Sequence, residues 1–171
     1  MALQKQDKAG LICFGPQIDA FIPADKKPTQ ISHIMEALYR SETNFLEPDF
    51  EKLFSVVRNK ITHRSLLVLF TNFESLESLE RELPSLKRLA HYHLLMVIFF
   101  ENTELKKLTD SKVYTTEDIY IKTIAGKYRY EKQLIARELR RHGIISVLTT
   151  PDKLSINSMN KYLELKNRQS I

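Results

Sequence analysis

Apolar positions along the chain fall into continuous runs and alternating segments, and both patterns predict strands. Runs at 65–70 (SLLVLF) and 94–100 (LLMVIFF) are bounded by polar residues, as in strands that helices cover on both faces. A similar run at 144–149 (IISVLT) predicts a last strand. A short run at 9–15 and an alternating segment at 17–23 predict a hairpin at one edge of the sheet.

Apolar residues at helical spacing predict the remaining elements. Helices are expected at 28–39, 49–61, 75–91, 103–109 and 116–142, and a last helix begins near Ser155. One face of the first helix carries Ile31, Ile34, Met35 and Leu38. Asp49 is expected to cap the second helix, and Gly143 follows the basic end of the long one. The alternation of strands and helices predicts an α/β fold, a doubly wound, mostly parallel sheet with one antiparallel edge strand.

Length and composition favour an ordinary globular domain. The chain has 171 residues, of which 43% are hydrophobic and 27% are charged, and we expect a single domain over 1–171. No apolar run reaches the roughly 20 residues of a membrane span, and the N-terminus lacks the apolar region of a signal peptide. A lone cysteine, Cys13, fits a reducing compartment, so a cytoplasmic location is expected. The net charge of +5 is too small to indicate nucleic-acid binding.

The sequence gives little support to an enzyme. It has four glycines and neither a G-x-G-x-x-G nor a Walker A spacing. Cys13 lies in the middle of a predicted strand, where a small core residue is expected rather than a nucleophile. His63, His91 and His93 lack a cysteine or a further nearby ligand for zinc and are expected to be histidines of surface turns.

Basic residues gather at the end of the long helix in the segment RELRRHG. They are Arg137, Arg140, Arg141 and His142. Positive charge complements the carboxyl end of a helix dipole, which explains this run without a nucleic-acid partner.

The polar pair Thr71-Asn72 follows the apolar run at 65–70. In doubly wound sheets, ligands bind beyond the carboxyl ends of strands, at the point where the strand order reverses. The pair therefore either reaches a ligand or simply starts the loop and caps the next helix.

Four blocks of the sequence resemble a known family. They are HRSLLVLFTNFES, LAHYHLLMVIFFENTEL, EDIYIKTIAGKYRYEKQLIARELRRHGIISVL and MNKYLELKNR. Together they resemble a bacterial family of von Willebrand factor A-like proteins of uncharacterised function, often encoded beside MoxR-type AAA+ ATPases. The resemblance implies a von Willebrand A-like (Rossmann-like) fold and a protein partner, with a MoxR-type ATPase as the candidate. Longer relatives would be anchored in membranes through segments absent from this chain.

The resemblance also implies a degenerate metal-ion-dependent adhesion site. Complete sites in the family have Asp-x-Ser-x-Ser after the first strand, a threonine in a later loop and an aspartate after the fourth strand. Thr43 matches the threonine, Asn72 stands where the aspartate is expected, and the Asp-x-Ser-x-Ser segment is absent. The chain then corresponds to a domain truncated at its amino-terminal end, without its first central strand. No cofactor is expected, and Mg²⁺ would bind only if the missing motif were supplied.

Two functional hypotheses follow from these observations. The first is a non-enzymatic protein-interaction module that works with a MoxR-type ATPase and does not bind nucleic acid. The alternative is a Rossmann-like hydrolase or transferase whose catalytic segment lies upstream of residue 1. Under either hypothesis, strands left unpaired beside the missing strand would favour self-association.

Overall fold

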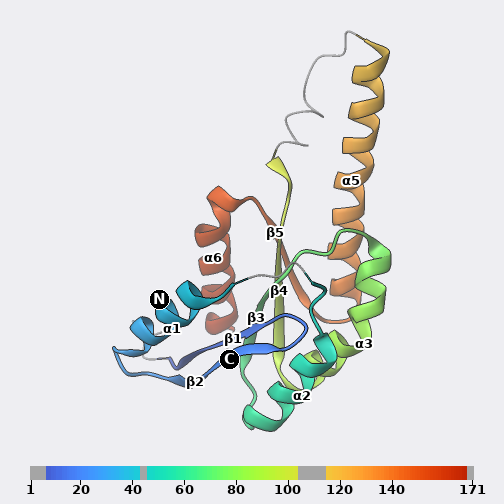
Figure 1. Ribbon diagram of the computed structural model, residues 1–171. Coiled ribbons are helices and arrows are strands. Elements are labelled where there is room, and N and C mark those ends of the chain that lie inside the picture. Colours follow the sequence, from blue (N-terminus) through green and yellow to red (C-terminus); the bar gives the residue numbers. More distant parts are fainter. Residues whose placement is uncertain (1–6, 43–45, 104–114, 169–171) are drawn as a thin grey trace. The chain divides into compact units, whose positions relative to one another are not determined.

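The computed structural model describes residues 7–42, 46–103 and 115–168 (Figure 1). The chain divides into two compact units, residues 1–60 and 61–171. The predicted α/β fold with parallel strands and flanking helices is confirmed. The expected single sheet is wrong, because the hairpin strands pair with each other in a sheet of their own.

The first unit contains an antiparallel hairpin and two helices. Strands β1 (Ala9–Phe14) and β2 (Ile18–Asp25) are the expected hairpin. Helices α1 (Gln30–Arg40) and α2 (Phe50–Lys60) lie within about one or two residues of the predicted boundaries. The Asp49 side chain accepts a hydrogen bond from a backbone N–H in the first turn of α2, which confirms the predicted cap.

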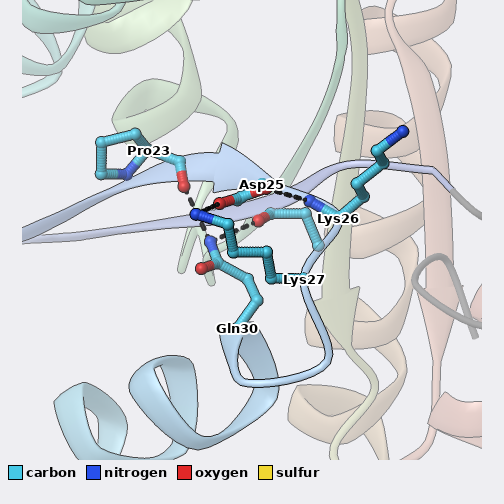
Figure 2. A network of polar contacts seen from close by, with 6 residues as sticks. Pro23, Asp25, Lys26, Lys27 and Gln30 are labelled. Atoms are coloured by element: carbon cyan, nitrogen blue, oxygen red, sulfur yellow. Dashed lines mark hydrogen bonds and ion pairs between the residues drawn. The ribbon is translucent and has the colours of Figure 1, made fainter.

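Gln30, the first residue of α1, fixes this helix to the hairpin (Figure 2). Its side-chain Nε2 donates hydrogen bonds to the backbone oxygens of Ala9 and Pro23, both at 2.7 Å. One buried amide thus joins the helix to both strands, and each strand supplies a carbonyl that would otherwise need another donor. Asp25 and Lys27 form an ion pair beside it at 3.4 Å.

One side of α1 is less buried than its helical pattern suggests. The side that is least exposed to solvent carries Gln30, Ile34 and Ala37, at helical spacing. The next side carries Ile31, Met35 and Leu38, which we call the α1 apolar stripe. These three side chains are 48–61% exposed. A helix face of this width exceeds what a two-stranded hairpin covers, so only part of the predicted face is buried.

The second unit is built on a parallel sheet. Its strands β3 (Leu66–Phe70), β4 (Leu94–Phe100) and β5 (Ile145–Thr149) lie in the order β3-β4-β5. The connections include α3 (Leu76–Tyr92) and α5 (Thr116–Arg141). Because these strands follow one another in chain order, the described sheet contains no reversal of strand order, the feature at which a ligand was expected.

The sheet of this unit lies between two helical layers. Helices α3 and α5 lie on one side of it, and α6 (Leu154–Asn167) lies on the other (Figure 1). The central strand β4 is buried from Leu95 to Phe99, so the prediction of helices on both faces is confirmed for this strand. For β3 that prediction is wrong, because Val68 and Phe70 are 40% and 55% exposed at the edge of the sheet.

Local signals define the ends of the helices. Ser75 caps α3 and Thr115 caps α5, each through a reciprocal capping box. Gly143 has a φ of 73° and ends the long helix as predicted. The helix expected at 103–109 lies almost wholly outside the described residues. None of the described helices has the length and apolar character needed to cross a bilayer.

Candidate functional site

Thr71 and Asn72 lie at the carboxyl end of β3, where the sheet gives way to a loop. The backbone N–H of Thr71 donates to the carbonyl of Ile98 at 3.1 Å and is the last link to β4. Asn72 is therefore the first residue beyond the sheet. The cap of the next helix is Ser75, so the interpretation of this pair as a helix cap is wrong.

The Asn72 side chain binds an internal cation. Lys132 Nζ, from α5, donates to Asn72 Oδ1 at 2.8 Å and to the backbone oxygen of Phe73. The Lys132 side chain is 2% exposed, and its Nζ lies 5.3 Å from the centre of the Tyr128 ring. An ammonium, two oxygen acceptors and an aromatic face together form the polar site at this edge of the sheet.

The charge of Lys132 is balanced by its surroundings only in part. Burial lowers the pKa of Lys132, while the negative charges of Glu74 and Glu131 act to raise it. A buried ammonium is costly unless oxygen atoms replace its water, and here Asn72 and Phe73 supply those oxygens. The site is thus a cross-link between α5 and the loop that follows β3.

This arrangement disfavours a metal ion at Asn72. Two unit charges 4 Å apart repel by about 4 kcal/mol near a protein surface, and a divalent ion doubles that. Mg²⁺ on Asn72 Oδ1 would share its ligand with the Lys132 ammonium. Thr43, the other residue of the expected site, lies outside the described residues. Among the described residues, no group of three or more His, Cys, Asp or Glu side chains is placed to hold a metal.

The three histidines considered for zinc differ in burial. His63 and His91 are exposed, and the His91 ring meets the Tyr92 ring edge-on at 4.9 Å. His93 is 4% exposed, so the prediction of a surface histidine is wrong there. It ends α3, and its backbone N–H donates to Leu89 at the point where the chain enters the buried strand β4.

The basic end of α5 is partly neutralised by its own acid. Glu138 accepts from Arg141 Nη1 at 2.9 Å and lies 3.1 Å from His142 Nε2. Burial acts to raise the pKa of Glu138, but the hydrogen bonds and charges of Arg141 and His142 lower it overall. This contact pairs the basic residues with an acidic side chain, and the complementation of the helix dipole stays a prediction for the basic run.

Lys132 was not among the residues predicted from the sequence, although a signal for it was present. It falls at helical spacing among residues that α5 turns inward. The buried members of that stripe are Ala125, Ile135, Ala136 and Leu139. A lysine inside such a stripe requires an oxygen partner, and the polar pair after a neighbouring strand is the natural place to look for one.

No family model, curated protein or solved structure matches this chain. A parallel sheet with helices on both faces is compatible with a Rossmann-like fold. The finer assignment to the von Willebrand A type stays a hypothesis based on the sequence blocks.

We expect millimolar Mg²⁺ to leave the melting temperature of this chain unchanged, because Asn72 is held by Lys132. A ligand at a thousandfold excess over its Kd would add about 4 kcal/mol, a shift of several degrees. Thermal melts with Mg²⁺ and with EDTA measure this directly. A rise of several degrees that disappears in Thr43→Ala would contradict the expectation.

Proposed function

We propose that this chain is a non-enzymatic protein-interaction module of the von Willebrand A-like type. Its partner is a MoxR-type AAA+ ATPase in the cytoplasm, and its metal-ion-dependent adhesion site is incomplete. The sequence blocks suggest the partner, and the α1 apolar stripe is the observation that carries the proposal. In a helix of a globular domain, residues at this spacing normally face a core, whereas here they are about half exposed.

The α1 apolar stripe has the form of a helix that binds in a groove. Ile31, Met35 and Leu38 stand at positions i, i+4 and i+7, the spacing of anchors in helix-in-groove recognition. An ion pair between Glu36 and Arg40, at 2.6 Å, lies on the same helix and supplies polar groups beside the apolar anchors. Interfaces commonly combine an apolar centre with a polar rim of this kind.

The geometry at Asn72 supports recognition that needs no metal. In a complete adhesion site, the ion offers an open position to an acidic group of the partner. Here the Asn72 oxygen accepts a hydrogen bond from Lys132, and the ammonium beside it disfavours a metal ion at this amide. The proposed contact therefore relies on apolar burial by α1.

The test is a titration of this chain with a purified MoxR-type AAA+ ATPase, followed by calorimetry. We expect each chain to bind one ATPase subunit, with the same affinity in Mg²⁺ and in EDTA. Met35→Glu should weaken binding at least tenfold, since burying one such side chain is worth about 1.5–3 kcal/mol. Ile156→Glu is the matched control, because Ile156 is also exposed (57%) but lies on α6.

Three results would contradict the proposal. The first is no binding of the ATPase by the folded wild-type chain. The second is binding that EDTA abolishes, which would restore the metal-dependent mechanism. The third is an equal loss in Met35→Glu and Ile156→Glu, which would show that α1 is not the contact. Circular dichroism of both variants establishes that they are folded.

A further inference from the structure

The strand β3 has an unprotected outer edge. It pairs with β4 on one side, and no backbone partner on its other side occurs among the residues that the structure describes. Edge strands usually carry a charged residue, a proline or a bulge that prevents pairing with another chain. The sequence LLVLF has only apolar residues, and its register with β4 is unbroken. Such an edge is a template for one more strand.

The hydrogen bonds between β3 and β4 show which backbone groups of β3 point away from β4. Both Ser65 and Thr71 hydrogen-bond to β4, the first through its carbonyl (2.9 Å) and the second through its N–H (3.1 Å). Along a strand, the N–H and C=O of one residue point to the same side, and the next residue points to the other. The groups directed to the free edge therefore belong to Leu66, Val68 and Phe70.

The same residues expose apolar side chains on the α6 side of the sheet. Leu66 packs against the buried cluster under α6, which contains Met96 and Ile98. Val68 and Phe70 share that face because side chains alternate along a strand, yet they are 40% and 55% exposed. Their register partners on β4, Met96 and Ile98, are completely buried. Free hydrogen-bonding groups and uncovered apolar surface thus coincide on one edge.

We infer that β3 pairs with β3 of a second copy of this chain, antiparallel and about a two-fold axis at Val68. Val68 then faces Val68 of the partner subunit, and Leu66 faces its Phe70. In an antiparallel ladder, residues whose backbone groups point at each other exchange two hydrogen bonds, and these residues have that phase. The pairing joins the two parallel sheets into one.

A second copy fits this edge because the strand is self-complementary about Val68. The residues that flank the apolar pairs bring Ser65 opposite Thr71 and Arg64 opposite Asn72, so no like charges oppose each other. A two-fold contact also closes, since each copy uses up the outer edge of its β3, and no fibre grows from this contact. The interface uses none of the α1 apolar stripe and does not rest on the proposed function.

The inference is tested by measuring the mass of the chain in solution by light scattering at about 100 μM, far above a micromolar Kd. The wild type should be a dimer. Val68→Lys and Val68→Glu should each be monomeric, because the two-fold axis brings each new charge opposite itself. A 1:1 mixture of the two variants should recover the dimer. Ile156→Lys, which changes a similarly exposed residue on α6, should remain dimeric.

A monomeric wild type would overturn the inference, and so would a dimer that survives in both charge variants. Failure of the mixture to associate would refute the register at Val68. A disulfide cross-link tests the same pairing and does not depend on whether the two charge variants fold. Val68→Cys in a Cys13→Ser background should form a disulfide between subunits on mild oxidation, because opposed residues of such a pair lie about 5.5 Å apart at Cα. Ile156→Cys in the same background should not.

Discussion

Replacing Lys132 with alanine is expected to lower the free energy of unfolding by about 3–5 kcal/mol. Alanine lacks the long, buried aliphatic part of the lysine side chain, and its removal leaves a cavity between α5 and the loop after β3. It also leaves the Phe73 carbonyl without its buried donor, which alone costs about 1–3 kcal/mol. Asn72 is exposed and recovers its hydrogen bond from water, so it adds little.

Lys132→Met separates the two contributions. Methionine keeps most of the aliphatic part and removes the ammonium together with its desolvation cost, so we expect a loss of only about 1–2 kcal/mol. Lys127→Ala is the matched control, since Lys127 is an exposed lysine of the same helix and should change stability by less than about 0.5 kcal/mol. Urea denaturation of the four proteins measures the differences. Equal stability of Lys132→Ala and Lys127→Ala would show that the buried cross-link does not stabilise the fold.

Most elements of the fold were predictable because their signals are local. Apolar runs defined β3 and β4, and Asp49 and Gly143 marked helix ends that the structure confirms. The separation of the hairpin from the parallel sheet was not predictable in this way. The pairing of strands depends on contacts between distant parts of the chain. An apolar run predicts a strand but does not show which other strand pairs with it.

The errors at β3 and α1 have the same physical origin. The run at 65–70 was expected to be covered on both faces, but a strand at the edge of a sheet has less cover than a central one. In α1, the helical pattern grouped Ile34 with Met35, and the narrow hairpin covers the first more than the second. Periodicity shows which residues share a face, and the size of the neighbouring element decides how much of that face is buried.

Only one of the two side chains that meet at the candidate site could be predicted from the sequence. The sequence indicated Asn72 as a polar residue at the end of a strand, and the structure places it there. Its partner is 60 residues away on α5, and no local pattern links the two positions. The Asn72 amide, predicted to belong to a degenerate metal site, accepts a hydrogen bond from a lysine, a contact that depends on how α5 packs.

Gly10→Ala is expected to destabilise the hairpin of the first unit by about 3 kcal/mol. A Cβ at Gly10 would lie 2.7 Å from the carbonyl oxygen of Ile22 and 2.9 Å from the backbone nitrogen of Ala24. Both atoms belong to the backbone of β2, so no side chain can move aside and the strands must separate. The register is already irregular between Ala9 and Leu11, where glycine lets the two backbones approach closely.

This separation should reach α1, because Gln30 is bonded to carbonyls on both strands, next to the affected pair. Amide hydrogen exchange should therefore show faster exchange in β1, β2 and the first turn of α1, with the parallel sheet unchanged. Gly126→Ala is the control, because its added Cβ meets no described atom within 4 Å apart from its chain neighbours and the backbone of its own helix. Alanine should stabilise α5 by about 0.5–1 kcal/mol. Unchanged protection of the hairpin in Gly10→Ala would refute the close approach. If protection is lost, the proposed binding of a MoxR-type ATPase should weaken as well, although no residue of the α1 apolar stripe has changed.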